Sequence, residues 1–396
     1  MATSATATSL LEKVKAIAPI IRANAAEAER ERQLSKATVE AMRDAGLYRM
    51  CVPRALGGLE TDAMTAIRVV EEVSRLDSAA GWNLLIAQGG VVFTAWLPGE
   101  VGREIFLGHP EAILCGALSP PGRAVPAEGG YRVTGRWPFA SGCNHATWML
   151  GSAFIYDEDN DKPRQDENGN PIMLMPAFPR ADATVLDTWH TVGMRGTGSH
   201  DFEVKDVFVP ESRTARVAPL KELPPAYDLP LFRMTLWFVV GVLGAAPLGT
   251  ARAAIDALIE LGNKKTPNYT RSPLAERPVA QMQVARAEAL TASARAYLYE
   301  SIRDAWDTAS QGHFLAKKQK MAIQLAVCQA MSASAEAVDL VHQAAGTTAI
   351  RQGQPFERYF RDAHVMTQHA FSSASRFESV GKLMFGVETD WPFFEM

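Results

Sequence analysis

The spacing of apolar residues changes twice along this chain, and these changes limit the folds it can adopt. Before about residue 95 the apolar residues recur at helical spacing, as in Leu10, Val14 and Ile17. From about residue 113 the apolar runs are short, rich in β-formers and bounded by Gly, Pro or Asn. After Pro219 long helical patterns return. The sequence therefore predicts an α+β protein with helical residues 1–112, β-rich residues 113–218 and a helical bundle over 219–396.

Local signals set several boundaries within these parts. Ser35 is placed to cap a helix, and Gly46 is placed to end it in a left-handed conformation. The polar stretch Asp157–Pro171, with Asn168-Gly169 inside it, predicts a solvated hairpin loop. Six segments are expected to be strands: Ile113–Ala117, Tyr131–Phe139, Trp148–Tyr156, Ile172–Phe178, Ala183–His190 and Phe202–Val209.

Composition excludes several classes of protein. A formal charge of -4 and a pI near 6.1 argue against a general nucleic-acid binder. The longest apolar stretch, Leu236–Leu248, contains two glycines and a proline and predicts a buried helix, so no membrane partner is expected. The N-terminus lacks the pattern of a secretory signal, and the 4 cysteines form no C-x-x-C. We expect a cytoplasmic protein with reduced thiols.

The common catalytic motifs do not occur in the sequence. There is no G-x-G-x-x-G after a strand, no phosphate-binding G-x-x-x-x-G-K-[ST], no H-E-x-x-H and no G-x-S-x-G. His364 and His369 are five apart, so a helix would not place them on one face as metal ligands. We expect no metal site and no tightly held nicotinamide cofactor.

Three segments have the residues to meet a flat ligand: Gly135–Trp148, Thr188–Asp201 and Arg361–Gly381. Each also has a simpler explanation. The glycines between Thr188 and Asp201 fit a tight β-loop as well as a loop that approaches a ligand closely. Ser141 is either a turn serine or a hydroxyl presented to a ring nitrogen. His369, expected on a long helix beside small residues, is either a buried histidine or a catalyst, and Arg361 and Asp362 could be a structural pair.

Taken together and in order, these segments resemble the acyl-CoA dehydrogenase superfamily. The closest likeness is to its two-component flavin-dependent monooxygenases, such as the 4-hydroxyphenylacetate, steroid-phenol and dibenzothiophene oxygenases. The family's W-I-T-N resembles Phe139–Gly142, so its flavin-N5 threonine corresponds to Ser141. The G-x-R-G-S loop resembles Gly193–Ser199, and R-D-A matches Arg361–Ala363. The resemblance implies an acyl-CoA dehydrogenase-like fold with a middle β-barrel or sandwich and a C-terminal four-helix bundle.

Two departures from the family pattern bear on the chemistry. Y-E-G, whose glutamate removes a proton from the thioester, falls on Gln368-His369-Ala370, and the alternative position within Leu229–Leu236 has no carboxylate either. A histidine, with an ordinary pKa of about 6.5, suits oxygenation of a phenol-like substrate better than dehydrogenation. The FAD-binding Q-x-x-G-G-x-G keeps only Gln343 and Gly346, which leaves FMN and FAD both open.

The resemblance therefore implies a monooxygenase that uses reduced FMN or FAD and O2 through a C4a-hydroperoxyflavin. Its substrate would be an aromatic or heteroaromatic small molecule, and a separate NAD(P)H:flavin reductase would supply the flavin. The alternatives are an FAD-dependent dehydrogenase with an unrecognised base and a catalytically silent flavoprotein. The predicted site comprises catalytic His369 and Ser141, substrate-binding Gln88, Trp137 and His369, and cofactor-binding Phe139, Ser141, Trp189, Arg195, Thr197, Ser199, Gln343 and Gly346.

Assembly is also implied by the resemblance, since relatives are homotetramers. The stripe of small residues from Ile323 to Val341 fits a buried subunit face, and it fits an internal bundle equally well. The apolar tail Thr389–Met396 is expected to cover either a neighbouring subunit or the mouth of the pocket.

Overall fold

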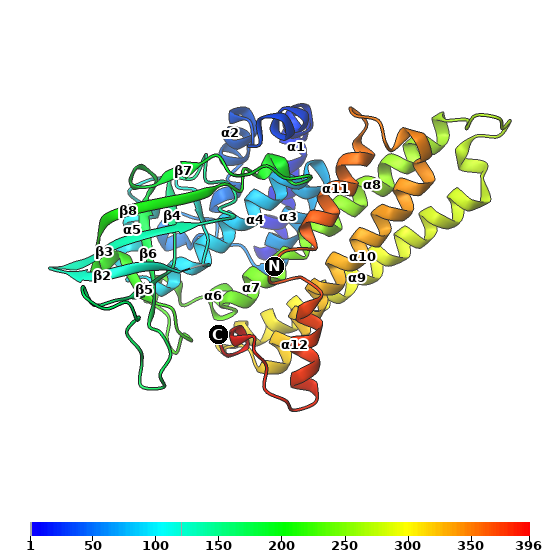
Figure 1. The fold of residues 1–396 in the computed structure, drawn as a ribbon. Helices are drawn as coiled ribbons and strands as arrows, with labels where there is room; N and C mark the ends of the chain where they lie inside the picture. Colours follow the sequence, from blue (N-terminus) through cyan, green and yellow to red (C-terminus); the bar gives the residue numbers. More distant parts are fainter. Residues whose placement is uncertain (1, 120) are drawn as a thin grey trace.

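The computed structural model describes residues 2–119 and 121–396 and begins with a helical region (Figure 1). The Ser35 side chain accepts a hydrogen bond from the Thr38 N–H, and Gly46 has φ of 79°, so both predicted boundary signals are confirmed. The helices of this region are α1 (Ala2–Glu31), α2 (Lys36–Asp44), α3 (Ala63–Leu76), α4 (Ser78–Phe93) and α5 (Gly99–Phe106).

The middle region is a curled, mixed sheet of nine strands in the order β1-β4-β6-β5-β2-β3-β8-β7, with β9 paired to β6. The predicted strand Trp148–Tyr156 is two strands, because the chain breaks at Gly151, where a Cβ would lie 2.9 Å from the Trp137 ring. The sequence missed β2, which has weak β-formers, and β9, which is very short. The strands are β1 (Leu114–Gly116), β2 (Gly122–Ala127), β3 (Gly130–Trp137), β4 (Trp148–Leu150), β5 (Ala153–Ile155), β6 (Met173–Pro179), β7 (Thr184–Leu186), β8 (Asp201–Pro210) and β9 (Thr214–Arg216).

The C-terminal region is helical, and four of its helices, α8 to α11, pack as an elongated bundle (Figure 1). The prediction that His369 lies on a long helix is wrong. The helix ends at Met366, and His369 lies in the turn before the next helix begins at Ser375. The helices are α6 (Pro230–Arg233), α7 (Leu236–Leu243), α8 (Ala245–Lys264), α9 (Pro278–Ser310), α10 (Lys317–Ala345), α11 (Pro355–Met366) and α12 (Ser375–Met384).

The helices at the two ends of the chain share one hydrophobic core. Leu10 and Val14 of α1 belong to the same buried cluster as Leu298 of α9 and Val327 of α10, while the sheet has a core of its own. Domain boundaries near residues 112 and 218 therefore stay a prediction. Burial of Ala330, Ser334 and the other small residues of α10 shows that their stripe packs inside this chain's bundle.

Two helical stretches are long and apolar enough to cross a membrane: Leu236–Lys264 and Lys317–Thr348. Of their most apolar windows, 89% and 67% respectively are buried inside the fold, as expected for core helices. The sequence prediction of a buried helix from Leu236 agrees with this burial.

The C-terminal tail packs on its own chain. The Phe394 ring stacks on Trp237 of α7 with ring centroids 5.2 Å apart, and Trp237 Nε1 donates to the Met396 carbonyl at 3.1 Å. The ring of Phe371, close to His369, contacts both Trp391 and Phe393. The tail thus forms part of the wall beside the His369 turn.

Candidate active site

His369 lies where the N-terminal helices meet the turn between α11 and α12. Its ring makes an edge contact with Trp82 of α4, with ring centroids 5.4 Å apart. Burial of the imidazole lowers its pKa to about 4, so the ring is neutral near pH 7. Nδ1 accepts a hydrogen bond from the Phe371 N–H at 3.3 Å, which places the proton of the neutral ring on Nε2. His369 is therefore equipped to donate a hydrogen bond.

Ser141 lies on the other side of Trp82. The Trp82 Nε1–H donates to Ser141 Oγ at 3.2 Å, and Ser141 Oγ is 2.6 Å from Ser199 Oγ. Ser199 Oγ is in turn 2.6 Å from Thr197 Oγ1. The fold thus brings together three predicted site residues from two loops and joins them to α4.

Phe139 and Trp189 form an aromatic surface next to these hydroxyls. Their rings meet edge to face with centroids 6.1 Å apart. Phe139 is 68% exposed, although it is large and apolar, and its φ of 63° is rare for a side-chain-bearing residue. An exposed ring on strained backbone is typical of a position that contacts a ligand.

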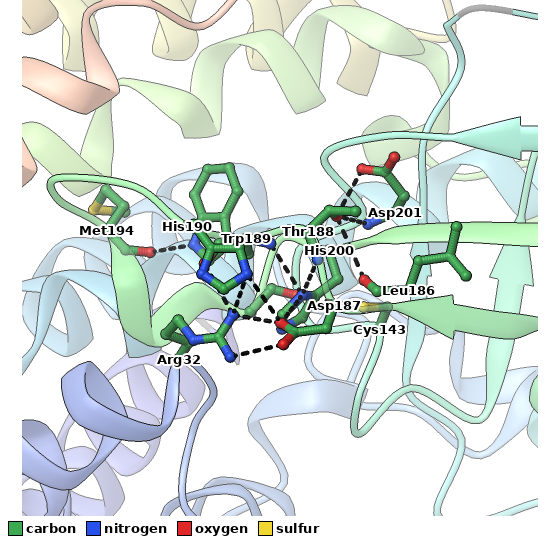
Figure 2. A network of polar contacts seen from close by, with 11 residues as sticks. Arg32, Cys143, Leu186, Asp187, Thr188, Trp189, His190, Met194, His200 and Asp201 are labelled. Carbon is green, nitrogen blue, oxygen red and sulfur yellow. Dashed lines mark hydrogen bonds and ion pairs between the residues drawn. The ribbon is translucent and has the colours of Figure 1, made fainter.

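A polar network holds the segment that carries Trp189 (Figure 2). His200 Nδ1 accepts from the backbone N–H groups of Thr188 and Trp189 at 3.2 and 3.1 Å. Asp187 forms an ion pair with Arg32 at the end of α1, and Arg32 lowers the pKa of this exposed carboxyl. Trp189 Nε1 donates to the Met194 carbonyl at 3.0 Å, so both the backbone and the ring of Trp189 are fixed.

Arg361 and Asp362 grip the glycine loop instead of pairing with each other. The buried Asp362 carboxylate accepts from the Met194 N–H at 2.6 Å, and Arg361 donates to the Val192 carbonyl and pairs with Glu29 and Glu357. A Cβ on Gly193 would lie 2.5 Å from the Arg361 carbonyl carbon. Burial raises the pKa of Asp362 to about 7. The two residues thus fix the loop on α11.

A cleft of about 770 Å³ lies apart from His369, between α1, the glycine loop and the segment before α11. Arg195 lines it, and its buried Nε has no hydrogen-bond partner. Four more arginines line this arginine cleft: Arg22, Arg30, Arg358 and Arg361. Only two carboxylates, Glu29 and Glu357, stand among them, so the cleft favours an anion.

Four predicted site residues do not join this cluster. Trp137 is fully buried in the core of the sheet, where it stacks on Phe202 and donates to the Ser152 carbonyl. The Gln88 amide is fully buried and bonds the backbone of Leu47 and Cys51. These contacts correct both substrate-binding assignments, because neither side chain is presented to a ligand. Gln343 and Gly346 are exposed at the end of α10.

Trp82 and Asp362 are the contacts that sequence reasoning missed. The only signal for Trp82 is a bulky indole within the small-residue run Ser78–Gly81 that precedes it. The signal for Asp362 is an acidic residue directly after Arg361, next to apolar helix positions. Within the described residues, no group of three or more His, Cys, Asp or Glu side chains could hold a metal ion.

Helices, a curled sheet and helices again, with a site at their junction, define an acyl-CoA dehydrogenase-like fold. Two family models match: the acyl-CoA dehydrogenase N-terminal domain over residues 6–97 and the acyl-CoA dehydrogenase C-terminal domain over residues 241–374. The chain belongs to the acyl-CoA dehydrogenase family.

Its relatives with known names are oxygenases. The chain is 35% identical over 369 residues to an indole-3-acetate monooxygenase of Pseudomonas putida, covering 92% of this chain and 90% of the relative. It is 27% identical to the oxygenase component of an FADH2-dependent resorcinol hydroxylase of a Rhizobium species, covering 96% and 94% of the two chains. Among solved structures, XiaF from a Streptomyces species, in complex with FADH2 and glycerol, has a TM-score of 0.90 and 29% identity over 98% of each chain.

Proposed function

We propose that this protein is the oxygenase component of a two-component flavin-dependent monooxygenase acting on an aromatic or heteroaromatic small molecule. The observation that carries the proposal is the junction itself. There Ser141 and His369 lie on opposite sides of Trp82, and His369 takes the place of the family's glutamate. The names of the relatives support the same class of reaction.

The residues present fit a flavin. The exposed Phe139 ring and the Trp189 ring offer apolar surface for an isoalloxazine, and Ser141 Oγ lies beside them. The unpaired Arg195 Nε and the arginine cleft suit the phosphate end of the cofactor. When bound in its reduced form, flavin supplies the electrons that activate dioxygen.

The roles of the surrounding side chains follow from their contacts. Trp82, Phe371, Trp391 and Phe393 surround the His369 turn with aromatic surface that excludes water and receives an apolar ring. His369 donates its Nε2–H to a polar atom of the substrate or to oxygen that is being transferred. With a pKa of about 4, it acts as a hydrogen-bonding group and only weakly as a base.

The test supplies reduced FMN or FADH2 from a reductase and measures incorporation of 18O from labelled dioxygen into indole-3-acetate, resorcinol and other aromatic compounds. We expect one labelled oxygen atom per product molecule, and at least a hundredfold loss with His369→Ala. Oxidation of an acyl-CoA under anaerobic conditions by the FAD-loaded protein would replace the proposal with the dehydrogenase alternative. Absence of flavin binding in either redox state would indicate a catalytically silent relative.

The proposal includes an assembly and partners. Oxygenase components work with a separate NAD(P)H:flavin reductase, and we place the protein in the cytoplasm with it. We also propose a homotetramer, because the outer side of α9 exposes Val279, Met282 and Tyr297. Gln343 and Gly346, remote from the site in their own chain, would then contact the cofactor of a neighbouring subunit. Light scattering of the purified protein tests the tetramer directly.

A further inference from the structure

Ser141 is the first of three buried hydroxyls that form a chain of hydrogen bonds. Ser141, Thr197 and Ser199 are 4%, 1% and 4% exposed, and their oxygens lie 2.6 Å apart in the order Ser141, Ser199, Thr197. One end of the chain meets the Trp82 Nε1–H at 3.2 Å. The other end meets the Met194 carbonyl, 2.7 Å from Thr197 Oγ1.

The two ends fix the direction of every hydrogen in the chain. A carbonyl only accepts, so Thr197 must donate its hydrogen to Met194. Thr197 then has no hydrogen for Ser199, so Ser199 donates to Thr197, and by the same argument Ser141 donates to Ser199. At the other end the indole N–H only donates, so Ser141 also accepts from Trp82.

This direction leaves Ser141 with one remaining capacity. A serine oxygen has one hydrogen and two lone pairs. The hydrogen goes to Ser199, and one lone pair accepts from Trp82. The second lone pair is free, so a ligand that reaches Ser141 meets an acceptor and no donor.

We propose that the chain from Thr197 to Ser141 makes the site selective for the reduced state of the flavin. The inference depends on the proposed function, in which Ser141 faces N5 of the isoalloxazine ring. N5 carries a hydrogen in reduced flavin and only a lone pair in oxidised flavin. The free lone pair of Ser141 can accept the N5–H of the reduced ring, whereas it faces the N5 lone pair of the oxidised ring without a hydrogen between them. Thr197 and Ser199 act through Ser141 and are positioning residues.

The surroundings of the chain hold this direction in place. The Gly142 N–H donates to the Thr197 carbonyl at 3.0 Å, and the Ala140 N–H donates to the His200 carbonyl at 3.0 Å. These bonds tie the Ser141 turn to the glycine loop on both sides of the hydroxyls. Asp362 fixes Met194 through its N–H, so the accepting carbonyl at the end of the chain is fixed too.

The experiment measures the Kd of oxidised FMN and of anaerobic, photoreduced FMN with the intact protein and its variants. The unaltered protein should bind reduced FMN at least tenfold more tightly. Thr197→Val removes the hydroxyl that donates to Met194 while keeping the shape of the side chain, so the chain can reverse and Ser141 can donate. Ser199→Ala breaks the chain in the middle and frees the same hydrogen. Both variants should reduce the preference about tenfold, which lowers the midpoint potential of bound FMN by roughly 30 mV.

Thr214→Val is the matched control. Thr214 is also buried and also donates its hydroxyl hydrogen to a carbonyl three residues earlier, that of Glu211 at 2.9 Å, but it lies on β9 outside the chain. It should leave the preference unchanged. A general disturbance of the fold would weaken both redox states together and leave their ratio as it was.

The outcomes separate this inference from the proposed function. If the unaltered protein binds neither oxidised nor reduced flavin, the proposed function fails. If it binds both equally, or if Thr197→Val and Ser199→Ala keep the original ratio, the hydroxyl chain does not set the preference and the inference is overturned. A reduced ratio in both variants, with Thr214→Val unchanged, supports it.

Discussion

The two sides of the candidate site are built from different kinds of contact. One side, the hydroxyl wall, consists of Ser141, Thr197 and Ser199 and is fixed by directed hydrogen bonds. The other side, the aromatic wall, consists of Phe371, Trp391 and Phe393 and is held by ring contacts 4.7 to 4.9 Å between centroids. Hydrogen bonds specify single atoms, while ring packing specifies only shape. The hydroxyl wall therefore suits a constant cofactor, and the aromatic wall suits a substrate that differs between relatives.

The largest expected effect comes from removing the support behind the hydroxyl wall. Asp362→Ala leaves the buried Met194 N–H without an acceptor and takes a counter-charge from Arg358. We expect a loss of about 3 kcal/mol in the free energy of unfolding, measured by urea denaturation, together with weaker flavin binding. Asp362→Asn keeps an acceptor for Met194 and should lose less than half as much. Equal losses for the two variants would show that charge, and not the bond to the loop, supports the wall.

Acid should destabilise the protein through the aromatic side of the site. Burial lowers the pKa of His369 and of His145 from 6.5 to about 4, so the folded state binds fewer protons than the unfolded state between these values. Stability is therefore complete above pH 6.5 and falls as the pH drops toward 4. Since both rings are partly exposed, we expect on the order of 2 kcal/mol per histidine.

The measurement is urea denaturation at pH 7.5 and pH 5 for the unaltered protein and His369→Phe. The variant should lose less stability on acidification, and the exposed His313→Asn should behave like the unaltered protein. Asp362, whose pKa is raised to about 7, acts in the opposite direction, because its folded state gains protons as the pH falls from 7. An unchanged pH dependence in His369→Phe would mean that the imidazole is not shielded from water.

Substrate affinity should respond to the aromatic wall alone. Phe371→Ala removes a ring that contacts His369, Trp391 and Phe393. We expect the KM for the aromatic substrate to rise about tenfold, while the Kd for reduced FMN stays within a factor of two. A parallel loss in flavin affinity would contradict the division of the site into two walls.

The smallest effect tests the residue that joins the walls. Trp82→Phe keeps a ring beside His369 and removes the Nε1–H donated to Ser141. The net loss of one neutral hydrogen bond predicts a decrease of about 1 kcal/mol in the free energy of unfolding, visible as a small shift in Tm. The hydroxyl chain keeps its direction in this variant, because Met194 still accepts from Thr197, so the redox preference should persist.

The fold was predictable from sequence because its parts differ in periodicity. Helical spacing around Leu10 and Val14 and short β-rich runs after residue 113 are local signals, and so are the Ser35 cap and Gly46. The break at Gly151 was not predictable, because it depends on how closely the Trp137 ring approaches from another strand.

The site was predictable only in part. Ser141, Thr197 and Ser199 were found because they lie in recognisable loops of the family, and the structure brings their hydroxyls together. Trp82 was missed, because its partners are Ser141 and His369, far away in the chain. Trp137 and Gln88 were assigned to the substrate for their side-chain chemistry, but packing uses the Trp137 ring in the sheet core and the Gln88 amide to bond backbone. Sequence gives the chemistry of a side chain, and only tertiary contacts show what that chemistry is used for.

The common core of the first and last helices has a practical consequence for the exposed loop Asp157–Pro171. A protease that nicks this loop would cut the polypeptide into two fragments, yet β5 and β6 on either side of the cut stay paired. Each fragment would also keep its share of the helices that bury one another, so the fragments should remain together through gel filtration. The loop is therefore a suitable position at which to split the protein into two pieces that reassemble.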